Sequence, residues 1–318
     1  MKNINAIDLF CGIGGSSSGA QAAGADVVAG VDAWDKALTT FEKNFSSALS
    51  FNERLDGKVP GRLKEATSRV DLLLASPECK SHTCAKGGRE RDEESRKTAY
   101  HVFAFVEEYR PQWIVVENVQ QMRQWKGYEN LKMRLKEEYY LEEKVMDAAD
   151  FGVPQTRRRL FLVGDRKREP KLPPEREGQT ATPARNILDR VDAWKCGPLD
   201  NGQRATSTLA RGQRAVDQLG KKVPYLIVYY GSDGGGGWQD LDRPLRTITT
   251  LDRFALVDWR NGQQVMRMLQ VPELKRAMGF KDNFDLICGS RREKINMLGN
   301  AVCPPVMEAI VGSLIGTR

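Results

Sequence analysis

The sequence predicts an α/β protein built on a doubly wound, mostly parallel sheet, with a smaller second domain. Up to Asp165, apolar runs typical of buried strands alternate with stretches typical of helices. In such sheets, ligands bind at the carboxyl ends of the strands. The residues with the most distinctive chemistry all lie just past predicted strand ends. Together these observations predict a ligand-binding crevice at one edge of the sheet.

The elements of the larger domain can be placed from their apolar patterns. The predicted strands cover residues 4–10, 27–32, 70–76, 113–119 and 159–165. The first predicted helix follows a glycine-rich turn and runs through Ala23. Three further helices are predicted over residues 33–45, 98–109 and 128–139. Pro111 is placed to stop the helix that precedes it. A last helix is predicted over residues 304–315, because it starts with prolines and carries apolar residues at positions 306, 310 and 314.

The character of the chain changes after Asp165. Residues 165–185 are charged and rich in proline, which is typical of a boundary. Residues 186–290 show no alternation of strands and helices, although an apolar strand over 225–230 precedes a glycine-rich loop over 231–239. We therefore expect a smaller, irregular or β-rich domain in this region.

Composition and charge limit the classes of function. The chain has 318 residues, of which 40% are hydrophobic, so it is globular. Its net charge of +7 favours a polyanionic partner. No apolar run approaches the length of a membrane span, and the first residues lack the layout of a signal peptide. The six cysteines form no CxxC pair. We expect reduced thiols, a cytoplasmic location and no membrane partner.

The first motif joins the first predicted strand to its helix, and reads Asp8-Leu-Phe-Cys-Gly-Ile-Gly-Gly-Ser16. Clustered glycines let backbone amides approach a ligand, and Asp32, after the next strand, could hold a pair of ribose hydroxyls. NAD is one interpretation, but its pattern needs glycine where this chain has Ser17. S-adenosylmethionine (SAM) uses the same strand, turn and carboxylate without a pyrophosphate. A tight turn without a ligand is the plain alternative.

The second motif places Cys79 on a proline-stiffened corner just past a predicted strand. A thiolate is the reactive form of cysteine, and the neighbouring Lys80 and His82 could lower its pKa. A zinc site from Cys79, His82 and Cys84 lacks a fourth ligand at suitable spacing, and the motif of zinc deaminases is absent. The alternative is a buried, inert cysteine.

Two further motifs carry charged groups. Glu117 ends an apolar strand, where partial desolvation should raise its pKa toward that of a useful proton donor. Arg157 and Arg159 alternate before a strand, so they share one side and could hold a phosphate and a base carbonyl. The alternatives are a capping or salt-bridged glutamate and a solvated basic edge.

In this order the motifs resemble those of the C5-cytosine-specific DNA methyltransferase family of bacterial or phage type. DLFCGIGG, SPEC, ENV and QTRRR are similar to its first, nucleophile, glutamate and Gln-x-Arg-x-Arg motifs. RPLRTITT (243–250) and GNAVCPPV (299–306) resemble the motif after the recognition region and the closing Gly-Asn-x-Val motif. The chain departs from the pattern at Glu78, Lys80 and His82, and the contact to adenine N6 is hard to place, with Asp56 as a guess.

The resemblance implies a division of the chain and a reaction. Residues 1–168 and 290–318 would form the catalytic, SAM-binding domain, and 169–289 the target recognition domain. Cys79 would attack C6 of a flipped cytosine, Glu117 would contact N3 and the amino group, and Arg159 would hold the carbonyl with Arg157 in support. The Gly87–Gly88 loop would close as a lid.

The resemblance also implies two sets of binding residues and no metal. The expected cofactor contacts are Asp8, Phe10, Cys11, Gly12, Gly14, Gly15, Asp32, Ala33, Pro77, Asn300 and Ala301. The expected substrate contacts are Lys80, His82, Asn118, Gln155, and, as readers of the major groove, Arg204, Arg211 and Arg214.

The partners implied are double-stranded DNA and a cognate restriction enzyme, with the chain itself a monomer. Three rival functions are the same chemistry on transfer RNA, a DNA-binding module without catalysis, and an NAD-dependent oxidoreductase. The long region between QTRRR and RPLRTITT favours DNA over transfer RNA as the substrate. The presence of Cys79, Glu117 and Arg159 argues against a module without catalysis, and Ser17 argues against NAD binding. We expect the cationic Lys80 to bind a phosphate beside the flipped nucleotide. The alternative is that the site accepts an anion, either a modified base or a SAM variant carrying a carboxylate on the transferred carbon.

Overall fold

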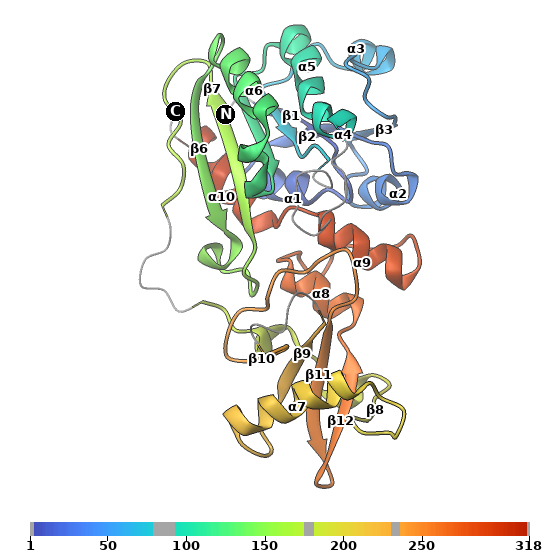
Figure 1. The fold of residues 1–318 in the computed structure, drawn as a ribbon. Helices are drawn as coiled ribbons and strands as arrows, with labels where there is room; N and C mark the ends of the chain where they lie inside the picture. The colour runs from blue at the N-terminus through green and yellow to red at the C-terminus, as the bar shows by residue number, and fades with distance from the viewer. Residues whose placement is uncertain (1–2, 79–92, 175–180, 230–235, 317–318) are drawn as a thin grey trace.

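The computed structural model describes residues 3–78, 93–174, 181–229 and 236–316 (Figure 1). Its larger part is a seven-stranded sheet in the order β3-β2-β1-β4-β5-β7-β6. All pairings are parallel except those of β7, which runs antiparallel to β5 and to β6. The strands are β1 (Asn5–Leu9), β2 (Asp26–Asp32), β3 (Leu49–Asn52), β4 (Leu72–Ala75), β5 (Trp113–Asn118), β6 (Tyr140–Asp147) and β7 (Arg158–Asp165).

Helices cover both faces of this sheet, because alternate residues of its central strands are apolar on both sides. Ala6, Leu72, Leu74 and Val115 belong to one core cluster, together with residues of α1 (Gly15–Ala22), α2 (Asp35–Asn44) and α10 (Pro304–Ile315). Their neighbours along the strands belong to a second cluster, with residues of α3 (Gly61–Ala66), α5 (Val102–Tyr109) and α6 (Lys126–Lys136). The predicted doubly wound α/β fold is therefore confirmed.

Several element boundaries differ from those predicted. β3 and β6 were not predicted from the sequence, because both lie at the sheet edges and carry polar residues. The helix predicted over 98–109 is a 3-10 turn over Thr98–His101 followed by α5. The helix ends at Arg110, which adopts a left-handed conformation with φ 48° before Pro111. The predicted strand 4–10 ends at Leu9, since Phe10 also has a positive φ of 58°.

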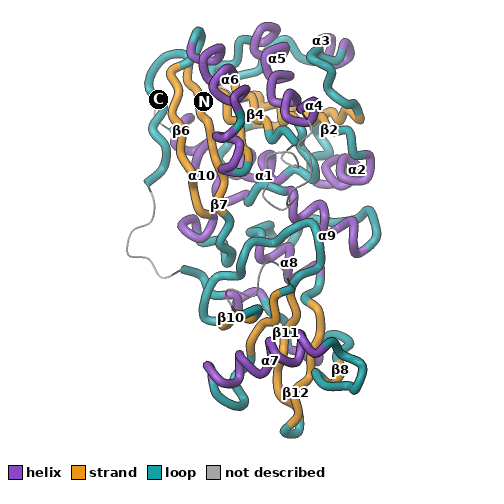
Figure 2. The backbone as a smooth tube through the Cα atoms, viewed as in Figure 1, coloured by secondary structure: helices purple, strands orange, loops and turns teal. Residues whose placement is uncertain are grey.

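The smaller part of the molecule is built on a five-stranded antiparallel sheet in the order β10-β9-β11-β12-β8 (Figure 2). Its strands are β8 (Gly197–Pro198), β9 (Tyr225–Val228), β10 (Trp238–Asp240), β11 (Phe254–Arg260) and β12 (Gln263–Met268). Helix α7 (Thr206–Leu219) packs on one face, where Gly212 approaches Leu199 and Tyr225. The predicted strand over 225–230 is β9. The β-rich character is as expected, and the domain boundaries at 168/169 and 289/290 stay predictions.

The two parts are joined at Gln155, and a buried ion pair lies at the root of the small domain. Gln155, before β7, pairs with Leu245 in a parallel bridge. At the root of the small domain, Arg267 of β12 and Glu273 of α8 (Val271–Ala277) form an ion pair in which both side chains are fully buried. Glu273 also accepts hydrogen bonds from the backbone amides of Asp189 and Gln270, at 2.8 and 2.6 Å. These added donors compensate much of the cost of burying the pair.

One stretch of the described chain, Arg291–Ile315, is long and apolar enough by composition to cross a membrane, although the sequence alone predicted none. The core helix of a soluble protein passes the same test, and half of this window is buried. The stretch comprises α9 (Arg291–Asn300) and α10, which are separated at Ala301–Cys303. Because α10 packs on the sheet beside α1, we interpret it as a core helix.

Candidate active site

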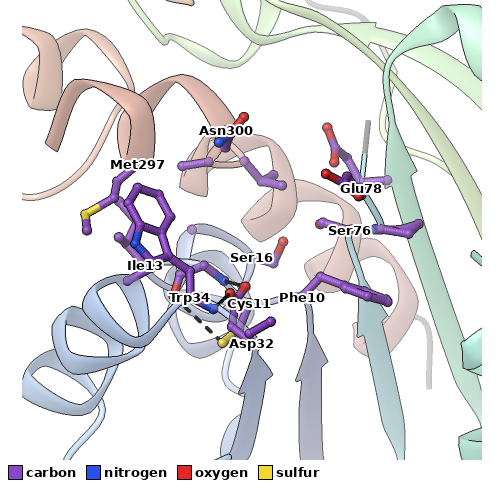
Figure 3. A pocket seen from close by; sticks show the side chains of 18 of the residues that line it. Phe10, Cys11, Ile13, Ser16, Asp32, Trp34, Ser76, Glu78, Met297 and Asn300 are labelled. Atoms are coloured by element: carbon purple, nitrogen blue, oxygen red, sulfur yellow. Dashed lines mark hydrogen bonds between the residues drawn. The ribbon is translucent and has the colours of Figure 1, made fainter. Parts of the chain in front are cut away.

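A cavity of about 450 Å³ lies at the carboxyl ends of β1, β2, β4 and β5, where the fold class predicts a ligand (Figure 3). Residues 297–302, at the end of α9, form its opposite wall. Of the predicted cofactor contacts, nine line this cavity: Phe10, Cys11, Gly12, Gly15, Asp32, Ala33, Pro77, Asn300 and Ala301. Chain segments nearly 300 residues apart thus meet at one site.

The glycine-rich turn after β1 has a shape that demands glycine. Gly12 and Gly14 adopt positive φ angles of 54° and 91°. A Cβ atom on Gly15 would lie 2.3 Å from the carbonyl oxygen of Val302. The turn therefore packs directly against the far end of the chain.

Asp32 closes the turn from the end of β2. Its two carboxylate oxygens accept hydrogen bonds from the backbone amides of Gly12 and Trp34, each at 2.8 Å. Burial raises the pKa of this carboxyl, and the amide hydrogen bonds oppose the rise. The amide of Gly14 is likewise bonded to Cys11 O at 2.8 Å. The backbone amides of Gly12 and Gly14, which could have bound a pyrophosphate, therefore already have partners within the protein. This favours SAM, which has no pyrophosphate, over NAD.

Asp8 and Gly14 do not line the cavity, contrary to the prediction of direct cofactor contacts. Asp8 is fully buried beneath the turn, where one carboxylate oxygen accepts hydrogen bonds from Ser17 Oγ at 2.6 Å and Ser17 N at 3.1 Å. Burial raises the pKa of Asp8 to about 7. Gly14 packs against the ring of Phe45. Both residues shape the turn from below.

Glu117 and Arg159 form the charged centre of the cavity. Glu117 is the last residue but one of β5 and is 7% exposed, and Arg159 Nε on the neighbouring β7 lies 3.3 Å from its Oε1. Burial raises the pKa of Glu117, while the positive charges of Arg159 and Arg157 lower it. A buried carboxyl of this kind can hold a proton or donate a hydrogen bond to a ring nitrogen.

The chain that leads to the predicted nucleophile is fixed at this centre. Pro77 and Glu78 line the cavity, and the amide of Asn118 donates to Pro77 O at 3.0 Å. Asn118 Oδ1 accepts from Val119 N at 2.8 Å, so its side chain joins the ends of β4 and β5. Asn118 does not line the cavity, although we expected it to contact the substrate, and its side chain instead holds two segments of the protein together. Cys79, Lys80, His82 and the Gly87–Gly88 loop lie outside the described residues.

Two polar side chains of the QTRRR segment bond to the protein backbone, and a third faces Glu117 in the cavity. Gln155 is fully buried, where it accepts a hydrogen bond from Ile248 N at 2.7 Å and donates one to Ala277 O at 3.0 Å. It does not line the cavity, although we expected it to contact the substrate. Arg157 lines the cavity, but its guanidinium donates to three backbone carbonyls. Arg159 is the member that faces Glu117.

Sequence reasoning missed several cavity residues. Trp34, Glu53, Leu55 and Met297 line the site, whereas the guessed Asp56 does not. Trp34 could have been found as the large aromatic residue two positions past Asp32. Glu53 and Leu55 follow β3, so they became visible only with that strand. Among the described residues, no group of three or more histidine, cysteine, aspartate or glutamate side chains is placed to hold a metal.

The three arginines proposed to read bases make contacts within the small domain. Arg204 donates to Leu199 O at 2.9 Å and Pro198 O at 3.3 Å. Arg214 donates to Gly236 O at 2.9 Å, and the guanidinium of Arg211 lies 5.3 Å from the ring centre of Tyr229. These contacts hold α7 and its flanking loops against the sheet, so a base-reading role for these arginines stays a prediction.

The chain is similar in sequence to bacterial methyltransferases. A family model described as C-5 cytosine-specific DNA methylase matches residues 4–316. Type II methyltransferase M.HaeII of Haemophilus aegyptius is 27% identical over 100% of this chain and 94% of the relative. Type II methyltransferase M.AgeI of Thalassovita gelatinovora is 32% identical over 51% of this chain. The alignments with M.AgeI and with M.HgiDI of Herpetosiphon aurantiacus span 39% and 52% of those relatives.

Solved structures share the same architecture. The Entamoeba histolytica methyltransferase EhMeth superposes with a TM-score of 0.70 at 16% identity, covering 100% of this chain and 99% of that one. A mutant of Spodoptera frugiperda DNMT2 superposes with a TM-score of 0.68 at 17% identity, covering 98% and 100%. At these identities the likeness concerns the fold alone. From the family match over residues 4–316, we conclude that this chain belongs to the C-5 cytosine-specific DNA methylase family.

Proposed function

We propose that this protein transfers a methyl group from SAM to C5 of a cytosine that is flipped out of double-stranded DNA. The observation that carries the proposal is the pairing of Glu117 with Arg159 in the same cavity as the Asp32 turn. A base held by Glu117 would therefore face whatever is bound along Phe10 and Asp32. The net charge of +7 is consistent with a polyanionic substrate.

The residues of the cavity fit SAM. Asp32 would hold the ribose hydroxyls, and Trp34 and Phe10 would give apolar walls to the adenine, while Asn300 lies at the opposite side of the cavity (Figure 3). Bound SAM would supply an electrophilic methyl group. The chain's own residues would orient it and exclude water around it, with no metal required.

Each of the catalytic groups then has a defined task. The Cys79 thiolate would add to C6 of the cytosine, and the electron pair displaced to C5 would form the new bond to the methyl carbon. The bond between that carbon and the sulfur of SAM would break in the same step, which releases S-adenosylhomocysteine. Glu117 donates a hydrogen bond at N3, which its raised pKa supports, and Arg159 holds the ring carbonyl. The C5 proton is then lost to a base, and the resulting electron pair expels the thiolate. The enzyme is thus regenerated.

The covalent step can be tested with Cys79→Ala and a duplex containing 5-fluorocytosine. The wild-type protein should form a stable adduct, because fluorine cannot leave as a cation, and the variant should bind DNA without transferring a methyl group. The control is Cys196→Ala, which alters a thiol in the small domain and should behave as wild type. A trapped peptide containing Cys11 or Cys84 would contradict the assignment.

The nature of the substrate and of the transferred group needs separate measurements. Labelled SAM should be offered with duplex DNA and with transfer RNA, and label in RNA alone would reject the proposed substrate. Sequencing of methylated cytosines in DNA from an expressing cell would then define the recognition site. Competition between SAM and its carboxylated analogue, followed by mass spectrometry of the nucleoside, tests the alternative suggested by Lys80. We expect 5-methylcytosine as the product.

A further inference from the structure

The buried guanidinium of Arg157 is bonded to the backbone on both sides of a cavity residue. Its Nη2 donates to Gly299 O at 2.6 Å and to Ala301 O at 3.0 Å, and Asn300 lies between these two carbonyls. Its Nη1 donates to Ile248 O at 3.0 Å. The side chain is 2% exposed, so water does not compete for these contacts. We propose that Arg157 is a positioning residue that acts through Asn300, and that it sets the end of the cofactor site opposite Asp32.

The carbonyls that Arg157 holds belong to a turn with little room to move. A Cβ on Gly299 would lie 2.4 Å from Thr249 O, so the turn lies directly against the segment after Ile248. That segment is itself fixed, because Gln155 Oε1 accepts from Ile248 N at 2.7 Å while Arg157 holds the carbonyl of the same residue. On the other side, Val302 O lies against Gly15.

The side chain of Asn300 depends on this support. Its Nδ2 donates to Asn296 Oδ1 one helical turn earlier, at 2.8 Å, and the exposed residue lines the cavity. In Figure 3, Asn300 and Asp32 lie on opposite sides of the cavity. A change at Arg157 should therefore disturb the side where Asn300 stands, and leave the Asp32 side intact. Arg159, two residues further on, bonds to Glu117 and takes no part in this support.

The test separates the two ends of the site by their ligands. Calorimetry should measure the affinity of the purified protein for S-adenosylhomocysteine, which spans the cavity, and for adenosine, which needs only the Asp32 end. Arg157→Gln should weaken S-adenosylhomocysteine binding by about 10-fold to 100-fold, as for lost hydrogen bonds to a charged group, and adenosine binding by less than about 2-fold. Arg158→Gln, on the exposed neighbouring residue, is the matched control and should change neither.

A double-mutant cycle asks whether the effect passes through Asn300. In an Asn300→Ala background, Arg157→Gln should cost little further affinity for S-adenosylhomocysteine. Additive losses, or equal losses for both ligands, would overturn the proposal and leave Arg157 a purely structural residue. If Arg157→Gln does not fold, Arg157→Lys is measured in its place, and an amine that reaches fewer carbonyls should give an intermediate loss.

This inference rests on the proposed SAM site, and the two can fail separately. If the wild-type protein binds neither S-adenosylhomocysteine nor SAM, the proposed function is wrong. If the wild type binds S-adenosylhomocysteine and SAM, and Arg157→Gln keeps full affinity for S-adenosylhomocysteine and adenosine, only the role of Arg157 is wrong.

Discussion

The edge of the seven-stranded sheet and the small domain use their charged residues in different ways. At the sheet edge, Asp32, Glu117 and Arg159 come from three separate segments and line one cavity. In the small domain, Arg204 and Arg214 bond to carbonyls of their own neighbourhood. Parallel strands place their carboxyl ends together whatever the loops contain, so a residue after a strand has a predictable place. No comparable rule places an arginine on α7.

The largest effect is expected at the sheet edge. Glu117→Gln should lower the rate of methyl transfer by roughly 10²–10⁴, because the amide cannot exchange a proton with the base. Single-turnover kinetics with saturating SAM measures this, and SAM affinity should stay near that of the wild type. Glu142→Gln, on the exposed face of β6, is the control. Normal turnover in Glu117→Gln would remove this residue from the mechanism.

A second effect concerns the pH dependence of stability beneath the cavity. The pKa of Asp8 is raised to about 7 from 3.8, so between these values the folded protein keeps a proton that the unfolded chain has lost. The free energy of unfolding should therefore fall with rising pH across this window, by about 4 kcal/mol from this group, and level off above it. Asp8→Asn should lack this contribution.

Urea unfolding of the wild type and Asp8→Asn at several pH values between 4 and 8 gives the difference directly, since the contributions of other groups cancel. The stability of the variant relative to the wild type should rise with pH. A difference that stays constant with pH would show that Asp8 is ionised in the folded protein.

Gly15→Ala should have an intermediate effect, because its Cβ would lie 2.3 Å from a backbone oxygen that cannot move aside without shifting the end of α9. We expect a loss of about 3 kcal/mol in the free energy of unfolding, together with weaker SAM binding. Gly61→Ala is the control, since its Cβ meets nothing within 4 Å and its φ is not positive. Equal stability of the two variants would show that the turn can relax.

The smallest effect is expected in the small domain. Arg204→Ala should cost about 1 kcal/mol of stability, because it removes hydrogen bonds to two carbonyls, and should relax the base preference at one position of the recognition site if Arg204 also reads a base edge. Methylation of a library of randomised duplexes measures the preference. An unchanged preference at every position would restrict Arg204 to its structural contacts and sharpen the contrast between the two regions.

The sequence predicted the central strands and the residues at their ends, because apolar runs and the topology of α/β sheets are both regular. It did not predict β3, whose four residues include the exposed Leu49 and the polar Ser50 and Asn52, and so Glu53 was missed with it. The distinction between Arg157 and Arg159 was also out of reach. Both line the cavity, as their spacing predicts, but the partners of Arg157 are carbonyls between 91 and 144 residues further along the chain.

The contact between Gly15 and Val302 has a consequence for biosynthesis. Translation delivers residue 302 long after residue 15, yet both walls of the cavity depend on this contact. Closing so long a loop carries a high entropic cost and tends to be slow. A ribosome-bound chain that lacks α9 and α10 has only half of the cavity. We therefore expect the nascent protein to acquire its ligand only once α9 and α10 have packed against the sheet, as a late step of its folding.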